Sequence, residues 1–157
     1  MNRPKLLILS GVPCSGKTTY AVKLMGTDPN YVVISRDFIR WEMEGPDYKH
    51  SSGNEKTVTI RFKNKLISAA DREKSIIIDN TNCTEKYLNS FIDLFQNKYP
   101  NYEISIKFFD ISLIKALVRN FIRAYRTNKY IPFKVLKRMH QNYNRIDKTQ
   151  YEYFLYE

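Results

Sequence analysis

The stretch Gly11-Val-Pro-Cys-Ser-Gly-Lys-Thr18 matches the pattern G-x-x-x-x-G-K-[ST] between a predicted strand and a predicted helix. Its glycines let the backbone curl until several N–H groups face one anion, and the next helix adds its N-terminal dipole. In such a loop the lysine reaches the β- and γ-phosphates of a nucleotide, and the hydroxyl binds Mg²⁺. We therefore predict that ATP and Mg²⁺ bind here, with Lys17 catalytic and Thr18 the metal ligand. The alternative is a tight glycine turn with an incidental lysine.

Strand-like and helix-like patterns alternate along the rest of the chain. Short apolar runs predict strands at residues 6–9, 31–35, 75–78 and 103–109. Helical spacing predicts helices at residues 18–25, 37–44, 55–72, 85–98, 113–125 and 132–146, with Gly26 ending the first and an exposed loop at 45–54. Strands that alternate with helices form a parallel sheet covered on both faces. The expected fold is therefore α/β, a three-layer P-loop NTPase fold with about four parallel strands.

The composition indicates one domain over residues 1–157, large enough for its own core. Two cysteines, Cys14 and Cys83, provide no disulfide framework and favour a reducing, cytoplasmic location. The first apolar run is too short for a signal peptide or a membrane span, so no membrane association is expected. The net charge of +10 indicates a polyanionic partner, or else a basic surface that serves solubility.

A carboxylate follows the second predicted strand, where ligands bind in this class of fold. Phosphoryl transfer to an alcohol needs a carboxylate that orients the hydroxyl and accepts its proton. Asp37 lies at the carboxyl end of the second predicted strand and at the start of a helix, so it is the candidate. Asp37 could instead be a helix cap. Arg36 and Arg40 flank it, and an arginine three residues on shares its helix face, so it could hold an acceptor phosphate. The alternative is a simple Asp–Arg surface pair.

Polar residues also follow the third predicted strand, in the run Asp79-Asn-Thr-Asn82. Asp79 could support Mg²⁺ through its water shell or could orient the acceptor. Asn80, Thr81 and Asn82 are candidate acceptor contacts. The alternative for these three is turn chemistry, because such side chains satisfy nearby backbone groups.

A basic segment lies before the last predicted helix, at residues 119–131. Arg119, Arg123 and Arg126 are spaced to share one helical face. A mobile arginine can neutralise charge on the transferred phosphoryl group and exclude water, so we predict a lid; a solvated basic face is the alternative. With Arg119 and Arg126, the residues expected to bind ATP are Gly11, Val12, Pro13, Cys14, Ser15, Gly16, Lys17, Thr18 and Thr19.

Taken together, the loop at 11–18, Ser35-Arg-Asp-Phe-Ile-Arg40, Ile78-Asp-Asn-Thr-Asn82 and the arginines before Ile131-Pro132 resemble the kinase domain of 5′-polynucleotide kinases. The resemblance covers about residues 6–146 in the same order. It implies that Asp37 is the general base for a 5′-hydroxyl, that Arg40 contacts the acceptor's phosphate, and that Arg123 is the main lid arginine. Around Asp79 the sequence is closer to the animal enzymes than to the phage one.

The chain departs from this family in two ways. Cys14 stands where many relatives have Gly, and no Asp-x-Asp-x-Thr motif of a 3′-phosphatase domain is present. A kinase-only layout of this kind would suit a virus or phage, acting in the host cytoplasm. The expected activity is transfer of the ATP γ-phosphate to the 5′-OH of single-stranded or frayed DNA or RNA ends. The many basic and aromatic residues suit single-strand binding, because phosphates meet Lys and Arg and bases stack on rings. The alternatives are a kinase of a small acceptor, such as a nucleoside, nucleotide or sugar nucleotide, and a non-catalytic binding module.

Overall fold

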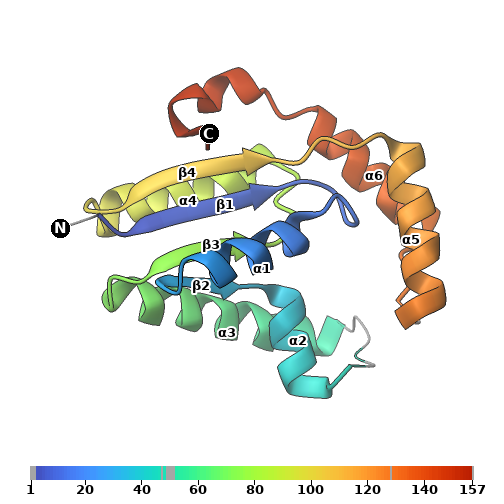
Figure 1. The fold of residues 1–157 in the computed structure, drawn as a ribbon, viewed down its shortest axis with the longest axis horizontal. Coiled ribbons are helices and arrows are strands. Elements are labelled where there is room, and N and C mark those ends of the chain that lie inside the picture. Colours follow the sequence, from blue (N-terminus) through green and yellow to red (C-terminus); the bar gives the residue numbers. More distant parts are fainter. Residues whose placement is uncertain (1–2, 47, 49–51, 128, 157) are drawn as a thin grey trace.

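The computed structural model describes residues 3–46, 48, 52–127 and 129–156. Within these residues, four strands and six α-helices follow one another along the chain, and a 3₁₀ helix comes after them (Figure 1). Their bounds are β1 Lys5–Ser10, α1 Lys17–Thr27, β2 Tyr31–Ile34, α2 Arg36–Glu44, α3 Ser52–Asp71, β3 Ser75–Asp79, α4 Glu85–Lys98, β4 Glu103–Phe108, α5 Leu113–Thr127, α6 Phe133–Asn144 and η1 Lys148–Phe154.

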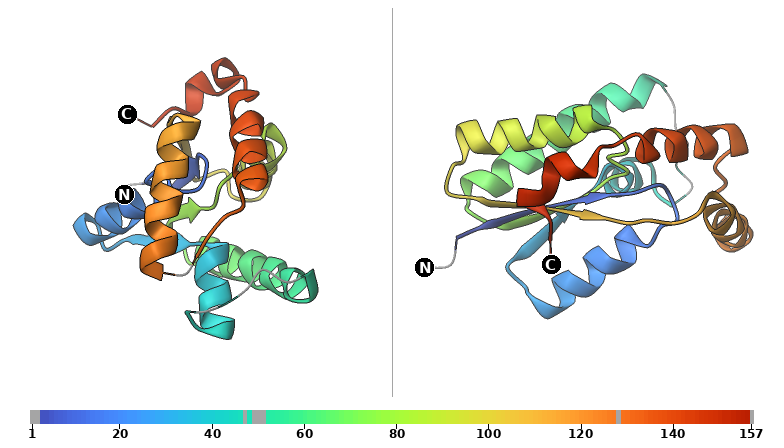
Figure 2. Two further views of the ribbon diagram at one scale, coloured as in Figure 1. Left: turned by 90° about the vertical axis from the view of Figure 1, so that its right-hand side faces the viewer. Right: turned by 90° about the horizontal axis from the view of Figure 1, so that it is seen from above.

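The four strands form one parallel sheet in the order β2-β3-β1-β4. Helix α1 covers one face of this sheet, and α3 and α4 cover the other (Figure 2). The predicted three-layer α/β fold with a four-stranded parallel sheet is therefore confirmed.

The central strand β1 explains why its sequence is apolar without alternation. Leu6 and Ile8 pack into the larger core with residues of α3 and α4, whereas Leu7 and Leu9 pack into a second core with Ala21 of α1. All four side chains are fully buried because a helical layer lies on each side. Burial on both faces holds β1 firmly inside the sheet, so the loop that follows β1 begins at a well-packed strand end.

Several helix boundaries differ by one to three residues from those expected from the sequence. Gly26 does not end α1, which continues to Thr27 and closes with the Asp28 N–H donating to the Leu24 carbonyl. A glycine near an exposed helix end is tolerated because it costs only about 1 kcal/mol. Helix α3 begins at Ser52, so the loop expected at 45–54 is shorter; its residues 47 and 49–51 lie outside the described part.

The sequence patterns also did not reveal η1, which lies at the end of the chain. Asp147 caps it by accepting a hydrogen bond from the Thr149 N–H, and Tyr151 is buried against the main core. Just beyond it, Leu155 forms an isolated parallel bridge to Ile106 of β4. These contacts join residues far apart in the chain, which periodicity within one segment does not reveal.

The sheet places its functional groups at one edge. The carboxyl ends of β1, β2 and β3 point toward α2, α5 and α6, which lie beyond that edge (Figure 1). In this class of fold, ligands bind at the carboxyl ends of the strands. No helix in the described part of the chain is long and apolar enough to cross a membrane.

Candidate functional site

The loop between β1 and α1 has the curled backbone that its sequence predicted. Cys14 and Gly16 both have positive φ angles, of 65° and 103°. The left-handed region costs an ordinary L-residue about 1–2 kcal/mol, whereas glycine occupies it freely. Cys14 therefore holds a backbone conformation that glycine adopts more easily than other residues.

Lys17 lies inside the curl of this loop. Its ammonium donates hydrogen bonds to the carbonyls of Gly11 and Val12, both at 2.7 Å, and to the Ser15 hydroxyl at 3.3 Å. The side chain is buried, and burial lowers the pKa of Lys17 while the nearby Asp79 carboxylate opposes that change. The lysine thus holds the loop closed and keeps a positive charge at its centre.

Thr18 and Asp79 bring two oxygen ligands together at the end of β3. The Thr18 hydroxyl donates to Asp79 Oδ2 at 2.7 Å. Burial raises the pKa of Asp79, while the hydrogen bond from Thr18 and the charge of Lys17 act against that rise. Mg²⁺ keeps several waters and takes one or two protein oxygens, so a hydroxyl beside a carboxylate fits this ion.

The three residues after Asp79 hold the surrounding segments in place. Asn80 Oδ1 accepts a hydrogen bond from the Arg36 N–H at 3.0 Å, and the Thr81 carbonyl accepts one from the Gly11 N–H at 2.9 Å. Asn82 is 3% exposed and donates to the Leu9 carbonyl at 2.8 Å. The side chain of Asn82 therefore lies in the interior, and its geometry matches turn chemistry rather than the predicted acceptor contact.

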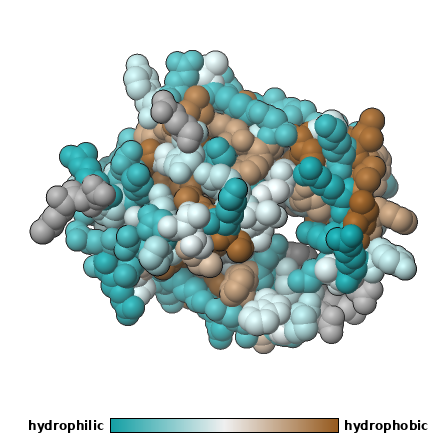
Figure 3. Space-filling model, in the orientation of Figure 1, coloured by the Kyte–Doolittle hydropathy of each residue, from teal (hydrophilic) through white to brown (hydrophobic). Residues whose placement is uncertain are grey.

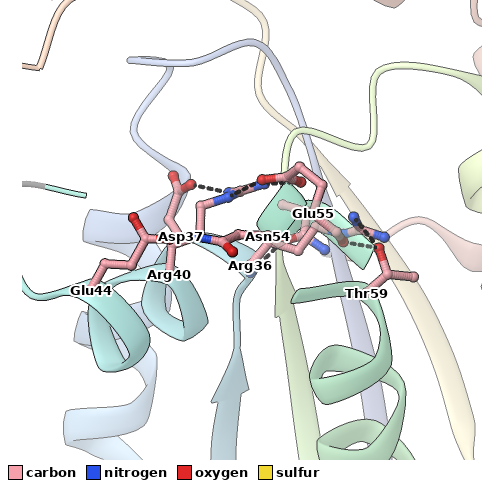
Figure 4. A network of polar contacts seen from close by, with 8 residues as sticks. Arg36, Asp37, Arg40, Glu44, Asn54, Glu55 and Thr59 are labelled. Atoms are coloured by element: carbon pink, nitrogen blue, oxygen red, sulfur yellow. Dashed lines mark hydrogen bonds and ion pairs between the residues drawn. The ribbon is translucent and has the colours of Figure 1, made fainter. Parts of the chain in front are cut away.

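Helix α2 presents Asp37 at the edge of the site (Figure 4). Arg40 Nη1 donates to Asp37 Oδ1 at 2.6 Å, and its Nε and Nη2 donate to the two carboxylate oxygens of Glu55, both at 2.8 Å. The guanidinium is buried, whereas the Asp37 side chain is 66% exposed. Arg40 is thus held by two carboxylates, and in this geometry it positions Asp37.

Asp37 lies within electrostatic reach of the loop. Its charge contributes to the pKa of both Lys17 and Asp79. Tyr48 hydrogen-bonds to Asp37, and burial together with that carboxylate raises the pKa of Tyr48 to about 12. Tyr48 was missed in the sequence because it falls within the polar loop at 45–54, where no periodicity distinguishes it.

Arg36 does not join this group. Its Nη1 donates to the Thr59 hydroxyl of α3 at 3.2 Å (Figure 4). Its guanidinium lies 5.5 Å from the centre of the Phe62 ring. The side chain predicted to contact the acceptor therefore lies along α3. Its backbone N–H, held by Asn80, fixes the first turn of α2.

The basic residues of α5 differ in what they contact. Arg119 Nη1 donates to the Cys14 carbonyl at 3.2 Å, so this arginine touches the loop directly. Arg123 Nε is buried and has no hydrogen-bond partner among the described residues, while Arg126 is exposed. Arg123 also lies near Tyr48, because its charge lowers the pKa of that tyrosine.

The predicted lid is anchored at its far end. The buried Asn120 side chain donates to the Ile131 carbonyl at 2.8 Å and accepts from the Ile131 N–H at 3.2 Å. In addition, the Lys129 ammonium lies 4.0 Å from the centre of the Tyr48 ring. Asn120 was not singled out in the sequence, since one asparagine among basic residues gives no signal.

Two hollows adjoin the loop. The space-filling view shows one between α5 and the elements that carry the loop and α2 (Figure 3). The other is a cavity of about 550 Å³ whose lining includes Ser15, Asp110, Lys115, Arg119 and His140. This volume is in the range of small-molecule sites. The loop therefore has space on two sides.

Replacing Gly11 by Ala is expected to deform the loop. An added Cβ would lie 2.8 Å from Ser15 Oγ, 2.9 Å from Phe109 Cβ and 3.1 Å from the Phe109 carbonyl. We expect ATP affinity to fall at least about tenfold and stability to fall by about 1–3 kcal/mol, as overpacking does. Calorimetric titration with ATP and a thermal melt measure both.

The matched control for this change is Gly26→Ala. A Cβ at Gly26 would meet nothing within 4 Å, and the residue lies inside α1. This variant should gain about 0.5–1 kcal/mol and bind ATP normally. Equal ATP affinity in both variants would contradict the tight approach at Gly11.

The chain is similar in sequence and fold to several known proteins. The model of the family described as "AAA domain" matches residues 6–146. The "Putative bifunctional polynucleotide kinase/RNA ligase" of Autographa californica nuclear polyhedrosis virus is 25% identical over 163 residues, covering 94% of this chain and 22% of that protein. A chain in the solved Pnkp1/Rnl/Hen1 RNA repair complex is 28% identical with a TM-score of 0.82, covering 98% of this chain and 48% of that chain.

A gluconokinase from Sinorhizobium meliloti 1021 shares the fold alone, at 16% identity and a TM-score of 0.52, covering 90% of this chain and 76% of that chain. The protein therefore spans about half of the solved RNA repair chain and about a fifth of the viral relative. The resemblance to polynucleotide kinases is confirmed, and the fold is that of P-loop kinases. Since the family model matches most of its length, the chain belongs to the AAA domain family of P-loop proteins.

Proposed function

We propose that this protein is a 5′-hydroxyl polynucleotide kinase, which transfers the γ-phosphoryl group of ATP to the 5′-OH end of DNA or RNA. The observation that carries the proposal is the position of Asp37. Its exposed carboxylate is held by Arg40 and Tyr48 at the carboxyl edge of the sheet, within electrostatic reach of Lys17 and Asp79.

The loop would receive the phosphates of ATP. Lys17 would exchange its bonds to the Gly11 and Val12 carbonyls for phosphate oxygens, because the same ammonium already lies within the curl. Thr18 and Asp79 would hold Mg²⁺, which neutralises charge on the β- and γ-phosphates when bound. The cavity of about 550 Å³ beside the loop would take the nucleoside part of ATP.

The acceptor would approach from the side of α2. Its 5′-oxygen forms the new bond to the γ-phosphorus, the bond from that phosphorus to the β–γ bridging oxygen breaks, and ADP leaves. The proton of the 5′-hydroxyl passes to the Asp37 carboxylate. Lys17, Arg119 and Arg123 would neutralise the charge on the transferred group.

A nucleic-acid end is favoured as the acceptor by two observations. Two relatives that cover 94% and 98% of this chain are named for polynucleotide kinase/RNA ligase and for RNA repair. The net charge of +10 also suits a polyanion. The competing proposal, a kinase of a small acceptor, rests on the fold shared with gluconokinase.

A panel of acceptors tests this proposal. We expect label from γ-labelled ATP to reach 5′-OH oligoribonucleotides or oligodeoxyribonucleotides, and not nucleosides, gluconate or a 5′-phosphorylated control oligonucleotide. The acceptor KM should rise steeply between low and moderate salt, because contacts to several phosphates release counterions. If label reaches only a small acceptor, and the KM for that acceptor does not change with salt concentration, the proposed polynucleotide kinase activity is wrong.

A further inference from the structure

Two large aromatic side chains stand exposed beside Asp37 on α2. Phe38 is 61% exposed and Trp41 is 48% exposed, and their ring centroids lie 5.7 Å apart with the planes tilted by 53°. Other residues of α2, such as the buried Ile39, form the helix face that packs against the core. The core therefore does not explain why two aromatic rings lie here.

The helix geometry relates Trp41 to the reacting position. Residues four apart lie on the same helix face, with Cβ atoms about 5–6 Å apart, so Trp41 is one turn from Asp37 on one side of α2. One ribose separates a 5′-oxygen from its own base by a comparable span. An acceptor whose 5′-hydroxyl meets Asp37 can therefore bring its first base to Trp41.

The charges around this aromatic pair favour a neutral group. Glu42 lies next to Trp41 and forms an ion pair with Lys65, and Glu44 contacts Asn54 at the end of the helix. The ion pair of Glu42 with Lys65 leaves no net positive charge that would attract a phosphate, whereas an uncharged base needs none. The phosphates of the strand would lie instead toward α5, which provides the exposed Arg126.

A protein partner fits this patch poorly. Stable protein interfaces bury about 800 Å² on each side, far more than two side chains provide. Base stacking on an aromatic ring needs only one exposed face, and it tolerates every base. The size of the patch thus matches a single planar ring.

We propose that Trp41, together with Phe38, forms a stacking platform for the 5′-terminal base of the acceptor strand. This inference rests on the proposed polynucleotide kinase activity and adds a binding position for the first nucleotide. It implies that the enzyme senses a base at the end of the strand, in addition to the hydroxyl and the phosphates.

Fluorescence tests this platform directly, because Trp41 is the only tryptophan in the chain. Without ATP, a 5′-OH oligonucleotide should quench the emission, and the same oligonucleotide with an abasic first position should quench it far less. Equal quenching by the two oligonucleotides, or none by either, would overturn the platform.

Kinetics supply a second readout. Trp41→Ala should raise the acceptor KM about 5- to 150-fold for the base-bearing oligonucleotide, which is the range expected from one lost stacking contact. The KM for the abasic oligonucleotide should change little, and Trp41→Phe should retain most of the wild-type value. The matched control is Tyr153→Ala, which removes an exposed aromatic ring from η1 and should leave both KM values unchanged.

The outcomes separate the platform from the activity on which it rests. If the wild type phosphorylates both oligonucleotides equally well, and Trp41→Ala raises both KM values alike, the platform is wrong while the polynucleotide kinase stands. If the wild type phosphorylates neither oligonucleotide and accepts only a small molecule, the proposed activity fails, and the platform fails with it.

Discussion

Lys17→Met is expected to lower turnover by about 10²- to 10³-fold, the loss that follows removal of one preorganised donor from a transition state. The ammonium is buried inside the loop, and its hydrogen bonds in the described part of the chain go to Gly11, Val12 and Ser15. Methionine keeps the length of the side chain but carries no charge and donates no hydrogen bond. ATP should therefore bind more weakly, and the bound γ-phosphoryl group should lose the cation that lies inside the loop.

This result is measured by steady-state transfer of labelled phosphate and by calorimetric titration with ATP. The matched control is Lys23→Met, which removes an exposed lysine from the same helix, α1. A thermal melt shows whether the Lys17 variant is folded. Turnover within about threefold of wild type in a folded Lys17→Met protein would mean that the loop does not deliver the phosphoryl group.

The fold was predictable wherever a segment carries its own signal. The run from Leu6 to Leu9 is apolar without alternation, as a strand with helices on both sides must be, and the glycines after it specify a curled turn. Because every strand of the sheet is parallel, the residues after β1, β2 and β3 necessarily meet at one edge. The proximity of Thr18, Asp37 and Asp79 followed from this rule alone.

Contacts between distant segments could not be predicted in the same way. The spacing of Asp37 and Arg40 indicates a shared helix face, and their ion pair confirms it. The spacing does not reveal that Glu55, from α3, binds the other side of the same guanidinium. Arg40 was therefore predicted to contact the acceptor, whereas the structure shows it bound by two carboxylates.

The asparagines show the same limit at the level of a single side chain. The sequence marks Asn80 and Asn82 equally, as polar residues after a buried strand. The backbone at Asn82 has a φ of 45°, which turns its amide inward to the Leu9 carbonyl, while Asn80 reaches the start of α2. The local turn decides whether Asn80 or Asn82 faces the site, and the residue types alone do not predict that turn.

Asp37→Asn separates the two interpretations of this carboxylate, as proton acceptor or as partner of Arg40. If Asp37 accepts the proton of the 5′-hydroxyl, turnover should fall by about 10²- to 10⁴-fold, because an amide cannot act as a base. ATP affinity should change little, since the hydrogen bonds of Asp37 among the described residues go to Arg40 and Tyr48 and not to the loop. Stability should fall by no more than about 1 kcal/mol, because the carboxylate is largely exposed and Arg40 keeps both bonds to Glu55.

The matched control is Glu42→Gln, on the same helix. Glu42 also belongs to an exposed ion pair, with Lys65 at 2.6 Å, so the two variants remove equivalent surface charges from α2. Single-turnover transfer to a 5′-OH oligonucleotide should be lost only in Asp37→Asn, while both variants should melt alike. If Asp37→Asn lowered the melting temperature and left the transfer rate intact, the carboxylate would only hold Arg40, and the base would have to be sought in another residue that faces Lys17.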